Sequence, residues 1–308
     1  MTLVTGAAGF AGSHLIELLS RRGDLVGWTR AEPSEPLSRL ASWQRVDLLD
    51  RDRVRSAIAD LRPSEVYHCA GSPRVAHSWH DTTASLSSNV LATHYLLDAL
   101  RLAAVSARVL ITGSAMVYAP SASPIAEDYP VAPDSPYALS KLAQEQLGLR
   151  AAAEDGLDVV VTRSFNHTGP RQSPDFAAPA MARQIALIER GRLDPVIRVG
   201  NLETQRDLTD VRDTVRAYAL LMERGTSGAV YNVASGVGRP IRALLEALIA
   251  RSRVAVNIQT DGSLLRPKDQ AMVVGDATRL RAQTGWAPEI DFDRMLDDLL
   301  EYWRGTVE

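Results

Sequence analysis

The chain has 308 residues, a length that fits about two average domains or one large α/β domain. Hydrophobic residues make up 45% of it, so a sizeable core is expected, and a net charge of −3 argues against nucleic acid as the main partner. A single cysteine, Cys69, excludes an internal disulfide and a cysteine-rich metal site. No apolar run reaches the roughly 20 residues of a membrane span, and the sequence begins directly with a strand-like run. We therefore expect a cytoplasmic enzyme with no signal peptide, membrane partner or metal.

Strand-like and helix-like segments alternate through the first half of the chain. The expected strands are residues 3–5, 25–28, 65–68, 109–112 and 159–163. The expected helices between and after them are residues 13–22, 51–61, 84–104 and 136–153. Strands and helices that alternate with short connections predict βαβ units and a parallel sheet covered on both faces.

This alternation ends near Gly169, where glycine, proline and polar residues form a loop. Three further helices are expected over residues 179–190, 210–224 and 292–304. We predict a doubly wound nucleotide-binding domain of residues 1–168 and a smaller α/β substrate-binding domain of residues 169–308. The segment near residues 210–235 is a candidate to return to the first domain.

A glycine-rich loop follows the first expected strand. Gly6, Gly9 and Gly12 form a GxxGxxG pattern that begins the first helix. Glycines at such a point allow a tight turn, a close approach to a pyrophosphate and helix packing on the strand, while helix N-terminal amides face the phosphates. The spacing is one residue wider than the common fingerprint, and a turn needed only for packing is the alternative.

The end of the second strand bears on the choice of cofactor. Arg30 stands where NAD-binding proteins carry an acid for the ribose hydroxyls, and a guanidinium there can pair with a 2′-phosphate. We therefore expect NADP(H), with NAD(H) as the alternative; an arginine that only meets solvent is the competing interpretation. Asp47 and Leu48 can frame the adenine, although Asp47 fits a helix N-cap equally well.

Tyr137 and Lys141 lie at an expected helix start, directly after Pro136. Residues four apart share one helix face, so the ammonium is expected to lower the phenol pKa from about 10 toward working pH and to hold a ribose hydroxyl. Of the 34 basic residues only Lys141 and Lys268 are lysines, which suggests that arginine does not serve here. A surface helix pair is the alternative.

Ser114 ends the strand-like run before that helix. Its hydroxyl is expected to hydrogen-bond the substrate oxygen, next to the tyrosine that transfers the proton. A serine that only caps a turn is the alternative. We predict Ser114, Tyr137 and Lys141 as the catalytic residues.

Together these residues resemble the extended short-chain dehydrogenase/reductases, a Rossmann-type family that uses NAD(P) with a Ser/Thr, Tyr and Lys set. The resemblance covers nearly the whole chain and implies a homodimer built on a four-helix bundle of residues 84–104 and 137–153. The cofactor contacts expected from the motifs and the resemblance are Gly6, Gly9, Phe10, Ala11, Gly12, Arg30, Asp47, Leu48, Ala70, Gly71, Asn89, Thr112, Tyr137, Lys141, Phe165 and His167.

Other segments resemble nucleotide-sugar members of that family. Residues 163–170 (RSFNHTGP) resemble the segment that lines the nicotinamide and the sugar diphosphate. Residues 205–211 (QRDLTDV) and 266–269 (RPKD) each resemble a clamp whose arginine pairs with a substrate phosphate, a geometry that suits bidentate guanidinium. Each arginine taken alone equally fits a solvated surface.

Within that branch the chain is most similar to the GDP-4-keto-6-deoxy-mannose reductases, through residues 165–172, 179–185 and 199–207. The resemblance implies reduction of the 4-keto group of GDP-4-keto-6-deoxy-D-mannose to GDP-D-rhamnose. The expected substrate contacts are Ser114, Ala115, Asn166, Arg171, Arg183, Asn201, Arg206, Arg266 and Asp269.

Three other functions are weighed against a reductase. A 4,6-dehydratase has acidic residues after the strand-end hydroxyl, but Ala115 and Met116 stand here and neither can transfer a proton. A nucleotide-sugar 4-epimerase would use the same tyrosine with tightly bound NAD, which Arg30 disfavours. A non-catalytic NADP-binding sensor would not need Tyr137 and Lys141 together.

Overall fold

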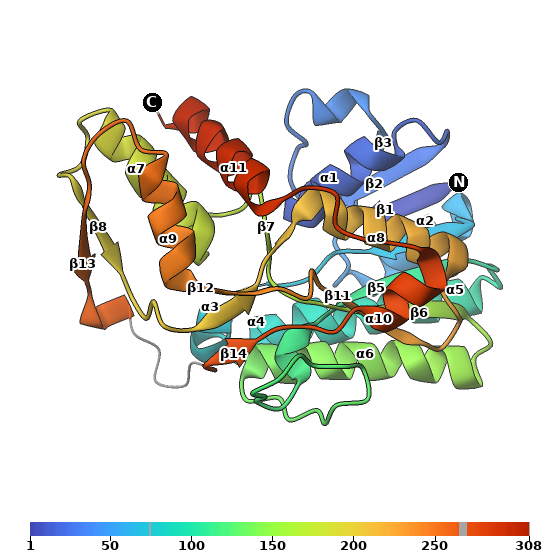
Figure 1. The fold of residues 1–308 in the computed structure, drawn as a ribbon. Helices are drawn as coiled ribbons and strands as arrows, with labels where there is room; N and C mark the ends of the chain where they lie inside the picture. The colour runs from blue at the N-terminus through green and yellow to red at the C-terminus, as the bar shows by residue number, and fades with distance from the viewer. Residues whose placement is uncertain (74, 265–269, 308) are drawn as a thin grey trace.

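A seven-stranded sheet forms the centre of the larger lobe in the computed structural model, which describes residues 1–73, 75–264 and 270–307 (Figure 1). The strand order is β11-β6-β5-β4-β1-β2-β3, and every pairing is parallel. These strands are β1 (Thr2–Thr5), β2 (Leu25–Thr29), β3 (Ser42–Arg45), β4 (Glu65–His68), β5 (Arg108–Ser114), β6 (Asp158–Ser164) and β11 (Val230–Val233). The order reverses between β1 and β4, which opens a ligand crevice at their carboxyl ends. The predicted Rossmann-type α/β fold is confirmed.

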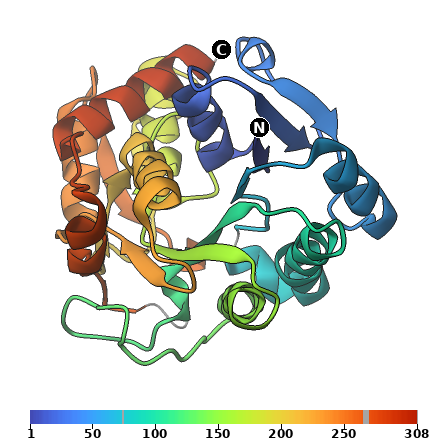
Figure 2. The ribbon, with the colours of Figure 1, turned by 90° about the vertical axis from the view of Figure 1, so that its right-hand side faces the viewer.

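Helices cover both faces of this sheet (Figure 2). On one face lie α1 (Phe10–Leu19), α8 (Val211–Arg224) and α10 (Thr278–Thr284); on the other lie α2 (Arg51–Leu61), α5 (Ala92–Leu102) and α6 (Pro136–Glu154). Neighbouring residues of β1 illustrate the burial on both sides, because Leu3 and Val4 are both 0% exposed yet belong to separate core clusters. This is why the strands are apolar runs without alternation.

The helix predicted over residues 84–104 is present but is not α-helical throughout. It consists of α4 (Thr82–Leu86), a π-helical turn η2 (Ser87–Leu91) and α5, with α3 (Val75–His80) just before them. The wider turn contains the buried Asn89, whose side chain bonds the Ser72 amide and the Ser140 hydroxyl. Single π turns inside helices frequently occur at functional sites.

The smaller lobe has its own core between α7 (Ala177–Glu189), α9 (Ile241–Ala250) and α11 (Phe292–Thr306) (Figure 1). Its strand pairs are β8 (Val196–Val199) with β13 (Asn257–Thr260), and β9 (Gln205–Asp207) between β12 (Gly238–Pro240) and β14 (Met272–Val273). Two short strands, β7 (His167–Thr168) and β10 (Thr209–Asp210), pair where the chain passes between the lobes. Single turns complete the described elements: η1 (Leu37–Arg39), η3 (Ala115–Val117) and η4 (Gly262–Leu264).

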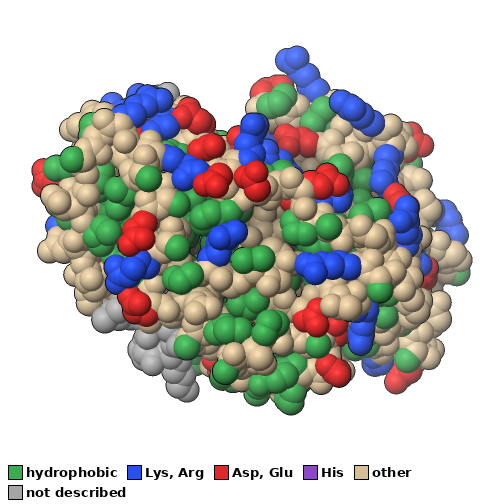
Figure 3. All heavy atoms as spheres, in the orientation of Figure 1, with side chains coloured by type: hydrophobic (Ala, Val, Ile, Leu, Met, Phe, Trp, Pro, Cys, Tyr) green, Lys and Arg blue, Asp and Glu red, His purple; other side chains and the backbone are tan. Residues whose placement is uncertain are grey.

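The chain crosses between the lobes more than once. After β9 in the smaller lobe it returns through α8 and β11, which lie on the sheet of the larger lobe, as does α10. In the same orientation, a space-filling view shows a notch between α11 and the segment around η1, with charged side chains of both signs along it (Figure 3). None of the described helices combines the length and apolar character needed to cross a bilayer.

Candidate active site

The glycine loop connects β1 to α1 and contacts the end of β4. Gly6 has a φ of +65°, and a Cβ there would lie 2.7 Å from the Cα of Ala70. A Cβ on Gly12 would overlap the carbonyl oxygen of Gly6. Gly9, the N-cap of α1, provides no side-chain cap, so the first-turn amides are available to an anion. The loop therefore has the close backbone packing that a pyrophosphate cradle requires.

Beside this loop lies a cavity of about 350 Å³. It is lined by residues from the ends of β1, β2 and β4, from the segment after β3 and from the η2–α5 helix: Thr5, Gly6, Ala8, Gly9, Trp28, Thr29, Arg30, Ala31, Val46, Asp47, Leu48, Leu49, Cys69, Ala70, Gly71, Ser88 and Ala92. Six predicted cofactor contacts beyond the glycine loop are among them or adjoin them, so the cavity has the position and lining expected for an adenosine.

Two polar residues of this cavity were ambiguous in sequence. Asp47 is not the N-cap of α2, because that position is held by Asp50, whose carboxylate accepts from the Arg53 amide at 3.0 Å. Asp47 instead accepts from the Leu49 amide at 3.0 Å and faces the cavity. Arg30 is exposed at its rim and has no ion-pair partner among the described residues.

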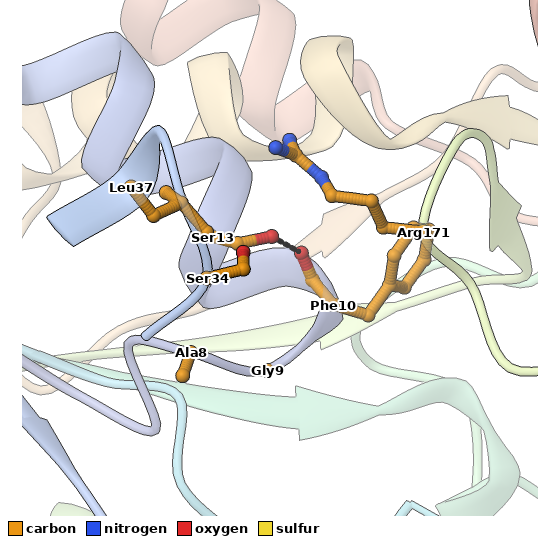
Figure 4. A pocket seen from close by; sticks show the side chains of 7 residues that line it. All are labelled: Ala8, Gly9, Phe10, Ser13, Ser34, Leu37 and Arg171. Carbon is orange, nitrogen blue, oxygen red and sulfur yellow. Dashed lines mark hydrogen bonds between the residues drawn. The ribbon is translucent and has the colours of Figure 1, made fainter. Parts of the chain in front are cut away.

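A second hollow, of about 200 Å³, lies on the other side of the loop (Figure 4). Its lining residues are Ala8, Gly9, Phe10, Ser13, Ser34, Leu37 and Arg171. Arg171, at φ +73°, donates to both carboxylate oxygens of Glu17 on α1, at 2.6 and 2.7 Å. The residue predicted to bind substrate thus lies against the cofactor-side helix.

The loop that carries Arg171 is held on α1 by two further contacts. The ring of Phe10 stacks on His167 with centroids 5.7 Å apart, and His14 Nε2 lies 2.9 Å from the Pro170 carbonyl oxygen. Burial lowers the pKa of His14 to about 4, so this imidazole is neutral at working pH. The predicted cofactor contacts Phe10 and His167 therefore lie together at the start of α1.

Ser114 and Tyr137 meet at the carboxyl end of β5. The serine is the last residue of that strand, and the tyrosine is in the first turn of α6, which begins at Pro136 and is capped by Ser135. Burial raises the pKa of Tyr137, while a hydrogen bond with Ser114 opposes the shift. The predicted lowering by Lys141 is wrong for this structure, because removing the phenolate from water dominates. A phenol that keeps its proton suits a proton donor.

Lys141 lies one helical turn after Tyr137 and is buried. Its Nζ donates to the Thr112 carbonyl oxygen and to Gln144 Oε1, both at 2.8 Å. Burial lowers its pKa to about 8. Gln144 was not identified from the sequence, although its spacing of three from Lys141 places both residues on one helix face.

Position 71, in the segment after β4, leaves no room for a side chain beside Asn89 and Lys141. A Cβ on Gly71 would lie 3.7 Å from Lys141 Nζ and would overlap the side-chain oxygen of Asn89. The backbone after β4 therefore approaches the lysine closely. Asn89, Gly71 and Lys141, three predicted cofactor contacts from distant parts of the chain, are brought together.

Three predicted substrate contacts lie on η3, just after β6 and on β9. Ala115 is buried beside Ser114 in η3, and Asn166 is exposed with its carbonyl accepting from the Thr209 amide at 3.0 Å. Phe165, a predicted cofactor contact, is buried directly after β6. Arg206 on β9 donates to the Gln270 carbonyl at 2.8 Å. Arg266 and Asp269 lie outside the described residues.

Two further predicted contacts lie in the smaller lobe. Arg183 is exposed on α7, with its guanidinium 6.0 Å from the ring centre of Trp303. Asn201 is exposed and its side-chain oxygen accepts from the Glu203 amide at 3.0 Å. Across the described part of the chain, no group of three or more His, Cys, Asp or Glu side chains is arranged to hold a metal ion.

A profile of the GDP-mannose 4,6 dehydratase family matches residues 3–299. The chain belongs to this family. It is 37% identical over 307 residues to a GDP-6-deoxy-D-mannose reductase of Pseudomonas aeruginosa, covering 99% of this chain and 97% of the relative. It is 31% identical to a UDP-glucose 4-epimerase of Mycolicibacterium smegmatis, covering 100% and 99%.

Solved structures of nucleotide-sugar enzymes share the fold. The structure of RMD from Pseudomonas aeruginosa complexed with NADPH matches with a TM-score of 0.87 at 35% identity, covering 99% of each chain. A UDP-glucose 4-epimerase of Thermus thermophilus complexed with NAD matches with a TM-score of 0.88 at 28% identity, covering 99% of each chain. Relatives of the GDP-mannose 4,6 dehydratase family thus differ in reaction, and the site residues must distinguish among them.

Proposed function

We propose that this protein uses NADPH to reduce the 4-keto group of a nucleotide-linked 4-keto-6-deoxy sugar, namely GDP-4-keto-6-deoxy-D-mannose to GDP-D-rhamnose. The observation that carries the proposal is the composition of the site around Ser114. Tyr137 is a proton donor there, whereas the two residues after Ser114 are Ala115 and Met116. A carbonyl reduction needs one hydride and one proton, and these residues can provide the proton.

Each catalytic side chain has a distinct part. Bound NADPH would supply the hydride. Tyr137 donates its phenolic proton to the carbonyl oxygen, and Ser114 donates a hydrogen bond to the same oxygen as negative charge develops on it. Lys141, one helical turn after Tyr137, would hold a ribose hydroxyl of the bound cofactor.

The same residues disfavour a dehydratase, despite the name of the family. Elimination of water across C5 and C6 needs further acid/base groups beside the strand-end hydroxyl, and the side chains of Ala115 and Met116 carry no transferable proton. An epimerase is the second candidate, because its tyrosine chemistry is the same and epimerases are among the relatives. Purification separates the two: NAD retained by the protein favours the epimerase, whereas exchangeable NADPH favours the reductase.

The cofactor preference is tested at Arg30. Its exposed guanidinium at the rim of the adenosine cavity can bind a 2′-phosphate, so Arg30→Ala should weaken NADPH binding by about 1.5–3 kcal/mol and NADH binding far less. Fluorescence titration with both cofactors measures this. Arg53→Ala, an exposed arginine on nearby α2, is the matched control and should change neither constant. An equal loss for both cofactors in Arg30→Ala would argue against a 2′-phosphate site.

The substrate is tested with NADPH oxidation against GDP- and dTDP-linked 4-keto-6-deoxy sugars and the free 4-keto hexose, with product configuration read by NMR. We expect GDP-linked sugar to be reduced and the free sugar to be a very poor substrate. Arg206→Ala should raise the KM for the nucleotide sugar roughly 10–100-fold with NADPH affinity unchanged, the scale of a lost charged hydrogen bond. Arg242→Ala, an exposed arginine of the same lobe paired with Glu203, is the control.

If the wild-type protein reduces the free and nucleotide-linked sugars equally well, the nucleotide-sugar assignment is wrong. The protein would then be a more general ketoreductase of this fold. Arg266 and Asp269 are proposed as further contacts to the diphosphate on the grounds of resemblance alone.

We also propose a cytoplasmic homodimer formed through α4, α5 and α6. The support is a set of large apolar side chains exposed on these helices and the turn between them: Leu86 at 37%, Leu91 at 43% and Leu139 at 52%. Exposed apolar groups of this kind are typical of association surfaces. A solution mass equal to one chain would contradict the dimer.

A further inference from the structure

Behind Lys141, four polar side chains are completely enclosed between β1, β4, α5 and α6. Thr5, His68, Thr93 and Gln144 are each 0% exposed. Their hydrogen bonds can be assigned a direction because each hydroxyl has a single proton. Thr93 Oγ1 lies 2.6 Å from the carbonyl oxygen of Asn89, which can only accept, so Thr93 donates its proton there.

Thr93 must then accept from its other two neighbours. These are Gln144 Nε2 at 2.7 Å and His68 Nε2 at 2.8 Å. The Gln144 amide is therefore oriented with its nitrogen toward Thr93 and its oxygen toward Lys141 Nζ, 2.8 Å away. Thr93 and Lys141 both require this orientation of the amide. In the flipped orientation the Gln144 NH₂ group would face the Lys141 ammonium, and both groups are donors.

The same constraint sets the tautomer of His68. Its Nε2 carries the proton, so Nδ1 accepts from Thr5 Oγ1 at 2.8 Å, and Thr5 Oγ1 in turn accepts from the Ala70 amide at 3.3 Å. Burial lowers the pKa of His68 to about 3, so the ring is neutral. One continuous set of hydrogen bonds thus connects Ala70, at the cofactor cavity, with the Lys141 ammonium.

The positive charge of Lys141 is stabilised by two uncharged acceptors, the Thr112 carbonyl oxygen and Gln144 Oε1. His68 at the end of β4 and Cys69 directly after it lie near the lysine, as does Tyr137 on the same helix. β5 and η2 contribute the uncharged Thr112 and Asn89. Burial raises the pKa of the Cys69 thiol to about 12 and that of the Tyr137 phenol, so all of these titratable neighbours are neutral near pH 7. The ammonium donates one proton to Thr112, one to Gln144, and has a third available for the active site.

We propose that Gln144 is a positioning residue for Lys141: its amide, oriented by the Thr93 hydroxyl that donates to the Asn89 carbonyl, keeps the lysine protonated and directs its remaining proton toward the active site. The inference deepens the proposed function, since it assumes that Lys141 takes part in it. Gln144 itself need not touch cofactor or substrate.

The test uses the fact that the chain has only two lysines, Lys141 and Lys268. Protein labelled with ε-¹³C-lysine and free of lysine in any tag gives two signals, assigned with Lys268→Arg, and each is titrated by NMR. Gln144→Leu removes an acceptor from the ammonium and should lower the midpoint of Lys141 by about one pH unit. Gln144→Glu has nearly the same shape, places a carboxylate against the ammonium and should raise the midpoint by about one unit or more.

Activity provides the second readout. The alkaline limb of kcat/KM should shift in the same direction as the midpoint in each variant, because it reports ionisation of the free enzyme. Gln283→Leu and Gln283→Glu are the matched controls, since that glutamine is exposed on α10 and bonds only the Arg224 carbonyl among the described contacts. If Gln144 had only a structural role, both Gln144 variants would be less stable, but the Lys141 midpoint would not shift in opposite directions.

An unchanged Lys141 midpoint in a folded Gln144 variant overturns the proposal. If neither variant folds, the wild-type protein decides: ¹⁵Nζ-labelled Lys141 should give a slowly exchanging ammonium signal, and rapid exchange with solvent overturns it. The NMR measurement needs no substrate. Opposite shifts without any sugar reduction would therefore uphold the positioning role and refute the proposed function, and sugar reduction without shifts would do the reverse.

Discussion

Replacing Tyr137 with phenylalanine should reduce turnover by roughly 10²-fold or more while NADPH binding stays within about twofold. The substitution removes the phenolic proton but keeps the ring that packs at the start of α6. Ser114 can still donate a hydrogen bond to the carbonyl oxygen, but no phenol remains to transfer a proton to it. The residual rate therefore reports hydride transfer without a positioned acid. Single-turnover NADPH oxidation and fluorescence titration measure the two quantities separately.

Tyr302→Phe is the matched control for this experiment. Tyr302 lies on α11 in the smaller lobe, next to Trp303. The Tyr302→Phe variant should therefore reduce the substrate at the rate of the wild-type protein. Normal turnover of Tyr137→Phe would show that the tyrosine is not the proton donor. A loss of NADPH binding as large as the loss of turnover would instead indicate that the hydroxyl mainly holds the cofactor.

Replacing Glu145 with alanine should lower the free energy of unfolding by about 3–5 kcal/mol. Glu145 on α6 accepts from Arg163 Nε at 2.9 Å and Nη2 at 2.7 Å, and the two side chains are 1% and 8% exposed. Without the carboxylate, the guanidinium of Arg163 remains buried with its charge unpaired, since its other contacts are the ring of Tyr118 and the carbonyl of Glu127. Denaturant unfolding of the variant and the parent protein measures the difference.

This ion pair also bears on the site, because it fastens the helix of Tyr137 and Lys141 to β6. Arg163 pairs with Gly113 across the sheet, one residue before Ser114. Glu154→Ala on the same helix is the control, because it breaks the exposed pair with Arg150 and should cost no more than about 0.5 kcal/mol. A loss in Glu145→Ala as small as in the control would show that the buried pair contributes little net stability.

Much of the fold followed from local patterns in the sequence. Apolar runs buried on both faces and helices with short connections predicted a doubly wound sheet, and the five predicted strands begin and end within one or two residues of their observed bounds. Position along one helix placed Lys141 beside Tyr137, because residues four apart share a face in any α-helix. Strand ends placed Gly6 and Ser114 at the same edge, because parallel strands all finish there.

Other features depend on side chains that meet only when the chain is folded. Arg171, a predicted substrate contact, pairs with Glu17, 154 residues away in sequence, and no local pattern selects that partner. The π turn at Asn89 likewise follows from partners at Ser72 and Ser140, which helix periodicity does not predict. The expected lowering of the Tyr137 pKa was wrong because sequence spacing reports proximity to a charge and carries no measure of burial.

The sequence by itself therefore determined five of the seven strands, the glycine loop and the candidate catalytic residues, since each depends on an apolar run, on the 3.6-residue helical repeat or on the end of a strand. Only the tertiary structure decided which protonation state those residues have. That state depends on the removal of water and on acceptors contributed by β1, β4, α5 and α6 together, as in the hydrogen bonds from Thr5 through His68 and Gln144 to Lys141.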